Sequence, residues 1–251
     1  CLMTVANLLT IDVGNTRTKW AIFNSTGKVL EQGFFVNAEL SQTQTPVAWQ
    51  GCDRALLASV AHPQVEASVA DLLKTFAISA KWLKSAAQSC GLKNGYQTPE
   101  KLGIDRWSAM LAGWKNHAGQ NTCLIVNAGT ALTIDAIHQD TFVGGNIAPG
   151  LPMMRAAFTE TALVSSQNGV YQVFPVNTAD ASYSGTLNAM AGAVLIQFNQ
   201  LEKLAKQKPV LILAGGDADC LASVLQVLGL EPKIADGLVL EGLFLMGGEA
   251  L

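Results

Sequence analysis

A short polar turn between two apolar strands occurs twice in this sequence, and its residues are suited to binding phosphate. The first copy places Asp12 and Gly14 at the end of an apolar run, and the second places Asn127 and Gly129 at the equivalent positions, 115 residues further along. A glycine lets the backbone approach a ligand closely, and successive turn amides form a concave site for anionic oxygens. Either copy alone would read as an ordinary β-hairpin. Their repetition at about half the chain length predicts two facing phosphate loops that hold a nucleotide.

Polar side chains in these turns extend the predicted phosphate site. Asp12 offers an oxygen ligand to Mg²⁺, an ion that prefers such ligands and usually keeps several waters. Lys19 adds a positive charge. Hydroxyl donors come from four threonines of the two turns: Thr16, Thr18, Thr130 and Thr133. The turns therefore predict a nucleotide bound together with Mg²⁺.

A third polar segment, between the two copies, has residues suited to acid–base chemistry. Asp105 and Arg106 follow a loop punctuated by Pro99 and Gly103, and they precede a stretch with helical spacing of apolar residues. At a helix N-terminus an aspartate is favoured by the dipole and caps free amides, which is one explanation of Asp105. The other is that Asp105 accepts the proton of a hydroxyl that attacks a γ-phosphate, while Arg106 binds a substrate carboxylate. Both interpretations stay open from the residues alone.

Composition and charge exclude several classes of protein. Of the 251 residues, 49% are hydrophobic and 14% are charged, as in a globular protein with a substantial core. The net charge of -3 is no footprint of nucleic-acid binding, and no apolar run approaches the roughly 18 residues that suggest a membrane span. The five cysteines are scattered without a C-x-x-C pair, which argues against a disulfide framework or a structural zinc site. We expect a cytoplasmic protein without nucleic-acid or membrane partners.

The order of predicted elements indicates an α/β fold made of two similar halves. Three strands open each half, near 8–14, 18–24 and 28–36 and again near 122–127, 131–138 and 141–145. The first half continues with a strand at 55–60, a helix after Pro63 and a strand at 81–83. The second continues with a helix after Pro149, a helix at 178–207, a strand at 210–214, a helix at 219–228 and a last helix from Asp236.

This element order resembles the duplicated ribonuclease-H-like fold of the actin, sugar kinase and heat-shock ATPase superfamily. The resemblance implies two similar lobes around a central nucleotide cleft. We expect the lobes to comprise residues 1–118 and 119–251. In open α/β sheets, ligands bind at the carboxyl ends of strands, where both Gly-Thr turns are predicted to lie.

Four motifs, in the same order and spacing, resemble those of type III pantothenate kinases. They are Asp-x-Gly-Asn-Thr-Arg-x-Lys at 12–19, Tyr-x-x-Pro-x-x-x-Gly-x-Asp-Arg at 96–106, Gly-Thr-Ala-x-Thr at 129–133 and Gly-Gly-x-Ile-x-Pro-Gly at 144–150. The run Ala214-Gly215-Gly216-Asp217 is similar to the family's adenosine-side turn. The resemblance covers nearly the whole chain. It implies phosphorylation of the primary hydroxyl of pantothenate with ATP and Mg²⁺, the first step of coenzyme A synthesis.

The resemblance also implies a role for each matching position. Asp105 would be the catalytic base, and Asp12 would hold Mg²⁺ through water. The residues around the ATP phosphates would be Asp12, Val13, Gly14, Asn15, Thr16, Arg17, Thr18, Lys19, Gly129 and Thr130. The pantothenate pocket would be lined by Tyr96, Gly103, Ile104, Asp105, Arg106 and a threonine, for which Thr178 after Asn177 and Thr186 are the two candidates. Thr178 has a second interpretation, as an ordinary N-cap of the helix 178–207.

One position departs from the family pattern, and two other functions stay open. Many members have aspartate where this chain has Asn127, and that aspartate helps to bind a monovalent cation, K⁺ or NH₄⁺. Asparagine keeps an oxygen ligand but lacks the charge, so we expect weaker dependence on potassium. The alternatives are a non-catalytic regulatory protein on the same fold and a kinase for a related small hydroxy acid. The set Asp12, Lys19, Asp105 and Arg106 argues against the regulatory protein.

A homodimer is expected from the helix 178–207 together with the resemblance. Apolar residues surround much of its girth: Leu187, Met190, Ala191, Val194, Leu195 and Phe198. Such a helix needs cover on more than one side, and either its own lobe or a symmetric second copy supplies it. The family dimerises and completes its pantothenate pocket near the subunit boundary, which would place Thr178 close to the interface.

Overall fold

The chain folds into two compact units of α/β type. The computed structural model describes residues 7–42, 47–160 and 169–249. One unit comprises residues 1–112 with 238–251, and the other comprises residues 113–237. The predicted lobes, 1–118 and 119–251, stay a prediction, and the main difference from these units is the place of the last helix.

The first unit is built on a five-stranded mixed sheet in the order β3-β2-β1-β4-β5. Its strands are β1 (Asn7–Val13), β2 (Arg17–Phe23), β3 (Val29–Val36), β4 (Cys52–Ser59) and β5 (Ser79–Trp82). β1 runs antiparallel to β2 and parallel to β4, so the carboxyl ends of β1 and β4 lie at the same edge. The register between β1 and β2 places Asp12 opposite Lys19.

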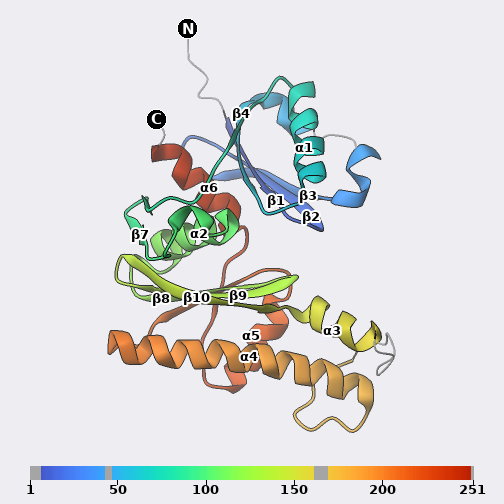
Figure 1. The fold of residues 1–251 in the computed structure, drawn as a ribbon, viewed down its shortest axis with the longest axis vertical. Helices are drawn as coiled ribbons and strands as arrows, with labels where there is room; N and C mark the ends of the chain where they lie inside the picture. Colours follow the sequence, from blue (N-terminus) through green and yellow to red (C-terminus); the bar gives the residue numbers. More distant parts are fainter. Residues whose placement is uncertain (1–6, 43–46, 161–168, 250–251) are drawn as a thin grey trace. The chain divides into compact units, whose positions relative to one another are not determined.

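Different helices cover the two faces of this sheet, as Figure 1 shows. The helices of the unit are α1 (Pro63–Thr75), α2 (Ile104–Ala112) and α6 (Leu238–Glu249). Leu9 and Ile11 of β1 are buried in one cluster with Leu73 of α1. On the other face, Phe23 of β2 stacks on Phe244 of α6 with ring centroids 4.8 Å apart. Alternate strand residues therefore serve two separate layers of the core.

The last helix belongs to the first unit because it packs closely against α2. A Cβ atom at Gly242 would lie 1.9 Å from the carbonyl oxygen of Ser108, so only glycine permits this approach of the two backbones. A Cβ atom at Gly247 would lie 2.6 Å from a methyl group of Leu56 on β4. These contacts explain why a segment expected in the second lobe completes the core of the first unit.

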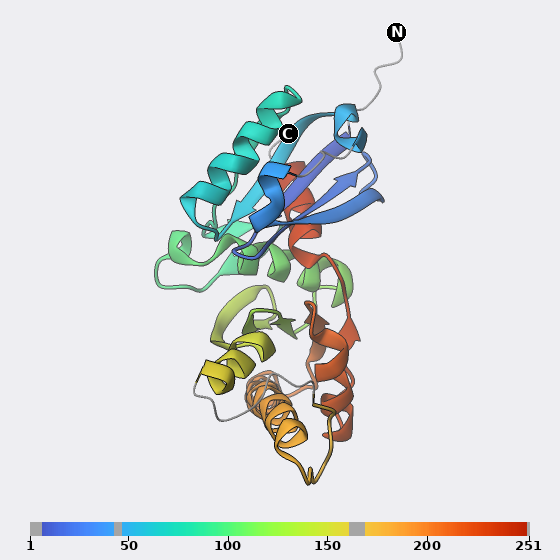
Figure 2. The same cartoon turned by 90° about the vertical axis from the view of Figure 1, so that its right-hand side faces the viewer.

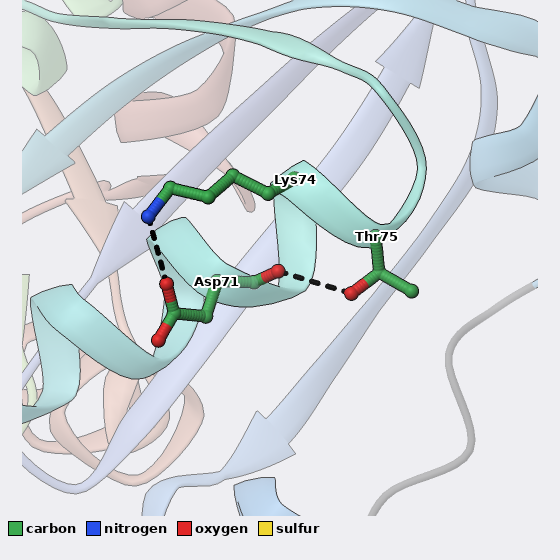
Figure 3. Close-up of polar contacts among 3 residues, drawn as sticks. All are labelled: Asp71, Lys74 and Thr75. Atoms are coloured by element: carbon green, nitrogen blue, oxygen red, sulfur yellow. Dashed lines mark hydrogen bonds and ion pairs between the residues drawn. The ribbon is translucent and has the colours of Figure 1, made fainter.

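The last turn of α1 lies at the surface and carries a local polar network (Figure 3). Lys74 Nζ pairs with Asp71 Oδ1 at 2.9 Å, and the Thr75 hydroxyl donates to the Asp71 carbonyl at 3.1 Å. The two charged side chains are 76% and 74% exposed, and exposed ion pairs contribute little to stability. The stability of α1 therefore comes from its buried apolar face.

The second unit has a sheet whose strands run in the order β12-β11-β8-β9-β10. They are β8 (Cys123–Ala128), β9 (Ala131–His138), β10 (Thr141–Pro149), β11 (Val210–Ala214) and β12 (Lys233–Ile234). The helices are α3 (Leu151–Glu160), α4 (Thr178–Ala205) and α5 (Ala218–Val227). A buried face of α4, with Leu187, Val194 and Phe198, shares a core with Leu221 and Leu225 of α5. Figure 2 shows the orange α4 nearly end-on beside α5.

Several short elements were not predicted from the sequence. They are the 3-10 helices η1 (Asn37–Gln42), η2 (Val47–Gly51) and η3 (Pro99–Lys101), the π-helical turn η4 (Gly113–His117), the hairpin of β6 (Gln88–Ser89) and β7 (Leu92–Asn94), and the strand β12. The other strands and helices lie near their predicted positions. Within the described residues, no helix is long and apolar enough to cross a membrane.

Candidate active site

The first predicted phosphate loop is a tight hairpin turn between β1 and β2. The Gly14 amide donates to the Arg17 carbonyl at 3.1 Å, and a Cβ atom at Gly14 would lie 2.9 Å from that same carbonyl oxygen. The tight turn therefore requires glycine at position 14. Asn15 and Thr16 are exposed at its tip, where they are available to a ligand.

Asn37, which no motif pointed to, braces this turn from behind. Its Nδ2 atom donates to the carbonyls of Gly14, at 2.7 Å, and Asn15, at 3.0 Å. Its Oδ1 atom accepts the Thr18 hydroxyl at 2.9 Å. Thr18 is fully buried, so its hydroxyl, which we expected to face phosphate, holds Asn37 instead.

The Asp12 carboxyl lies at the carboxyl end of β1 in a strongly perturbed environment. Burial, and next the negative charge of Asp105, raise the pKa of Asp12 to about 7, while the charge of Lys19 opposes this rise. Asp12 keeps a partly accessible surface. Two interacting carboxylates at one strand end disfavour their joint ionisation, and a divalent cation would relieve this repulsion. The donor set therefore fits Mg²⁺.

The start of α2 carries the predicted base. A Cβ atom at Gly103 would lie 2.6 Å from Asp105 Oδ1, so the absence of a side chain at Gly103 makes room for the carboxylate. Asp105 is partly buried, whereas Ile104 and Arg106 are 7% and 8% exposed. Tyr96, upstream of the helix, is 40% exposed. The segment 96–106 thus combines a partly buried carboxyl, a buried arginine and an exposed tyrosine next to the start of α2.

Three segments of the first unit meet at this edge of the sheet. The Val60 amide, after β4, donates to the Val13 carbonyl at 3.2 Å, and Asn15 Nδ2 donates to the Val60 carbonyl at 3.4 Å. A Cβ atom at Gly103 would lie 4.0 Å from Val60 Cγ1, so the two segments are neighbours. The structure therefore brings together residues 12–19 and 103–105, as expected for a site at the carboxyl ends of parallel strands.

The second predicted phosphate loop, between β8 and β9, is shaped by backbone contacts. The Gly129 amide donates to the Ala131 carbonyl at 3.1 Å, and the Gly150 amide donates to the Thr130 carbonyl at 3.0 Å. A Cβ atom at Gly150 would lie 2.0 Å from the Gly129 carbonyl oxygen. Gly150 closes the 144–150 motif and was absent from the predicted site residues, although it fixes this loop.

Asn127 lies beside the glycine turn after β11. Gly215 has a φ of +101°, and its Cβ atom would lie 2.2 Å from the Ala128 carbonyl oxygen and 2.6 Å from Asn127 Oδ1. The Asp217 amide donates to the Ala128 carbonyl at 3.0 Å. Among the described residues, no group of three or more His, Cys, Asp or Glu side chains is placed to hold a metal ion. The Asn127 position therefore supplies a neutral oxygen and no carboxylate cluster.

The two candidate substrate threonines differ in their surroundings. Asn177 is the N-cap of α4 and accepts from the Asp180 amide at 2.9 Å, so the interpretation of Thr178 as the cap is wrong. Thr178 is the exposed first residue of the helix. Thr186 is 4% exposed, and its hydroxyl donates to the Ser182 carbonyl at 2.9 Å. Thr178 is thus the accessible candidate.

The chain is similar to proteins of one family over nearly its whole length. The family profile described as Type III pantothenate kinase matches residues 8–200. A type III pantothenate kinase of Methylobacillus flagellatus is 40% identical over 248 residues, which cover 95% of this chain and 97% of that protein. A type III pantothenate kinase of Nitrosospira multiformis is 36% identical over 248 residues, covering 96% of this chain and 91% of that protein.

Solved structures share the fold at low sequence identity. A conserved Baf family protein from Campylobacter jejuni has a TM-score of 0.62 at 18% identity and covers 96% of this chain and 98% of that chain. MreB 5 of Spiroplasma citri, bound to AMPPNP, has a TM-score of 0.51 at 9% identity and covers 97% and 96%. The predicted fold of the actin, sugar kinase and heat-shock ATPase superfamily is confirmed. With the family profile and the relatives, the predicted ATP-dependent kinase is confirmed too, and the chain belongs to the type III pantothenate kinase family.

Proposed function

We propose that the protein transfers the γ-phosphoryl group of ATP to the primary hydroxyl of pantothenate, with Asp105 as base. The observation that carries the proposal is the pair of interacting carboxylates, Asp12 and Asp105, beside a turn whose amides suit phosphate. One carboxylate near a metal and one near a hydroxyl are the two charges that phosphoryl transfer needs. Both predicted phosphate loops, 12–19 and 129–130, contact ATP in this proposal.

Asp105 acts on the hydroxyl of the substrate. Its carboxylate takes the hydroxyl proton while the oxygen forms a bond to the γ-phosphorus, and the bond from phosphorus to the leaving oxygen of ADP breaks. The buried Arg106 cation attracts the carboxylate of pantothenate. Tyr96, Gly103, Ile104 and Thr178 line the rest of the pocket.

Asp12 and Lys19 act on the negative charge of the nucleotide phosphates. Asp12 holds Mg²⁺ through water, and Lys19, opposite it in the register, offers a point charge to phosphate. When bound, Mg²⁺ neutralises negative charge on the phosphates. Asn127 keeps one neutral oxygen for a monovalent cation, K⁺ or NH₄⁺, and the missing charge makes this site weak.

We also propose a cytoplasmic homodimer with no nucleic-acid or membrane partner. A stretch before α4 exposes four apolar side chains by 62–98%: Val170, Val173, Phe174 and Val176. It leads directly to Thr178, so a second copy that covers it would lie close to the substrate threonine. On α4 itself, Leu195 packs partly buried against the core of its own unit, whereas Ile196 is 60% exposed. A charged substitution at Leu195 would therefore disturb the core of its own unit and would not test the dimer alone.

Phe174→Glu tests the dimer. The charge should dissociate it in sedimentation and raise KM for pantothenate, because Phe174 is 89% exposed in the single chain. Val227→Glu, at a 69% exposed site on α5, is the matched control and should leave both unchanged. A fully active wild-type monomer at micromolar concentration would contradict the dimer.

A coupled ADP-release assay tests the reaction. Pantothenate is compared with a panel of other hydroxy acids and alcohols at saturating ATP and Mg²⁺. We expect ADP release with pantothenate and little with the other alcohols. Faster release with a different hydroxy acid would replace pantothenate as the substrate, and no release with any alcohol would favour a regulatory role.

A further inference from the structure

We propose that Asn37 is a positioning residue for the ATP phosphates, because it turns three successive peptide units of the 14–17 loop to face a ligand. This inference rests on the proposed function, in which that loop contacts ATP. Asn37 lies outside every motif of the sequence, and it contacts the loop through backbone carbonyls. Its role is to hold backbone amides in the orientation that an anion needs.

The contacts of Asn37 use both of its side-chain polar atoms and its own amide. Nδ2 donates to the Gly14 carbonyl at 2.7 Å and to the Asn15 carbonyl at 3.0 Å. The backbone amide of Asn37 donates to the Thr16 carbonyl at 3.0 Å. Three consecutive carbonyls of the loop therefore point at one residue.

The opposite side of the loop follows from peptide geometry. In a trans peptide the N–H points away from the C=O of the same unit, and the described backbone contains no cis peptide bond. The carbonyls of residues 14, 15 and 16 share their peptide units with the amides of Asn15, Thr16 and Arg17. Those three amides consequently point away from Asn37. Successive amides on one side of a turn form an anion-binding concavity.

The carbonyls of Gly14 and Asn15 only accept, so they fix which end of the Asn37 amide faces the loop, and Thr18 holds the other end. The buried Thr18 hydroxyl donates to Oδ1 at 2.9 Å, which leaves Nδ2 for the two carbonyls. Aspartate at position 37 would accept from Thr18 equally well but would present a carboxylate oxygen to the carbonyls of Gly14 and Asn15, which also only accept. The site therefore requires the amide of asparagine and not merely its shape.

A brace of the same kind elsewhere in the unit provides a matched control. Asn24 Oδ1, in the turn between β2 and β3, accepts from the Thr26 amide at 3.0 Å, the Thr26 hydroxyl at 2.8 Å and the Lys28 amide at 2.9 Å. Removing either asparagine deletes a turn brace, but only Asn37 orders the predicted phosphate loop. Asn24→Ala therefore reports the effect of a purely structural loss.

The experiment compares Asn37→Ala, Asn37→Asp and Asn24→Ala in the full chain. Calorimetric titration with MgADP, KM for ATP, KM for pantothenate and the thermal midpoint are measured for each. We expect Asn37→Ala to weaken MgADP binding and raise KM for ATP by about 10-fold, since misplacing one or two hydrogen bonds to a charged group has that effect, while KM for pantothenate changes by less than about 2-fold. Asn37→Asp should weaken nucleotide binding at least as much. Asn24→Ala should lower the midpoint and leave nucleotide affinity unchanged.

Two results would overturn the proposal. One is unchanged nucleotide affinity in a folded Asn37→Ala variant, and the other is an equal loss of affinity in Asn24→Ala. If the Asn37 variants do not fold, Thr18→Val is the deciding variant. It removes the hydrogen bond that holds Oδ1 of Asn37 and should weaken MgADP binding by about 3-fold or more. Unchanged affinity would again overturn the proposal. MgADP binding does not depend on the identity of the alcohol, so failure to phosphorylate pantothenate would refute the proposed reaction separately.

Discussion

The two phosphate loops have one sequence pattern but are held in shape by different means. The first loop, at 12–19, is ordered by a side chain, that of Asn37, and carries a carboxylate that interacts with Asp105. The second loop, at 127–133, is ordered by glycines, Gly150 and Gly215, that let neighbouring backbone approach within van der Waals distance. Its counterpart of Asp12 is the neutral Asn127.

The difference between the loops distinguishes what the shared backbone pattern supplies from what individual side chains supply. A strand–turn–strand unit positions amides wherever it occurs, so both copies can approach phosphate. Acid–base chemistry needs in addition a charge in a partly buried place, which costs stability unless a partner offsets it. At the strand end that precedes the turn, the first copy has the carboxyl of Asp12, whereas the second has the neutral amide of Asn127. The repeated strand–turn–strand pattern therefore accounts for the likeness of the two loops, and the residue at the strand end accounts for their difference in charge.

The largest expected effect tests whether the chemistry resides in the first unit alone. Asp105→Asn keeps the shape of the side chain and removes its basic oxygen, so turnover should fall by about 10²–10⁴-fold, the usual contribution of a general base. Rates at saturating ATP and pantothenate, with far-ultraviolet circular dichroism as the folding control, measure this. Near-normal turnover in a folded variant would mean that Asp105 only caps α2.

The next prediction concerns backbone packing in the second loop. Gly150→Ala puts a methyl group 2.0 Å from a carbonyl oxygen, so the free energy of unfolding should fall by about 3 kcal/mol. Gly129→Ala is the matched control, because its Cβ atom would lie 3.9 Å from the Ala131 carbonyl oxygen, an ordinary contact. Urea unfolding of the two variants compares them. Equal losses of unfolding free energy in the two variants would show that the close backbone approach at Gly150 does not stabilise the second loop.

A smaller effect follows from the charge that only the first loop carries. The folded-state pKa of Asp12, about 7, lies above the ordinary aspartate value of 3.8, so the folded state binds more protons than the unfolded state between these values. The Asp12 contribution to stability therefore falls as pH rises from about 4 to about 7 and stays low above that. Without nucleotide or metal, Asp12→Asn should raise the free energy of unfolding by about 1–2 kcal/mol at pH 8.

The advantage of Asp12→Asn should vanish as the pH approaches 4, since Asp12 is then protonated in the folded wild type. Urea unfolding at several pH values measures the difference. An advantage independent of pH would contradict the assigned cause. The second loop has an amide at the equivalent position and should contribute no such slope.

The smallest effect sharpens the contrast between the two strand ends. Asn127→Asp adds an acidic oxygen at this strand end, so activation by potassium should become steeper by several-fold. Rates in potassium, ammonium and a bulky organic cation at fixed ionic strength compare the variant with the wild type. A steep and potassium-selective requirement in the wild type would show that the neutral oxygen of Asn127 is sufficient.

The sequence predicted those features that are local in the chain. The strands around Asp12 and Asn127, the glycine turns and the helix start at Asp105 all follow from patterns within about 15 residues. The placing of Asp12 and Asp105 in one site followed only from the family resemblance, because Asp105 lies at a helix start far along the chain from Asp12.

Features that depend on contacts between distant segments were missed. Asn37 lies after β3 in a short turn with no motif, and only the folded structure brings it behind the loop. Trp49 is fully buried against Trp20 and Phe35 in a turn that has no periodicity. Thr186 and Thr178 are alike as residues, and only burial separates them. The place of α6 depended on the contact of Gly242 with Ser108, which no local pattern encodes.

The packing of α6 on the first unit has a consequence for synthesis of the chain. During synthesis, residues 238–249 leave the ribosome after all of residues 113–237. Domains generally fold as units while the chain emerges. Residues 113–237 are thus complete while Phe23 and the apolar face of β2 still await Phe244 and Leu240. The half of the protein made first is therefore the half that finishes folding last, and until then the Phe23 face of β2 is exposed to water.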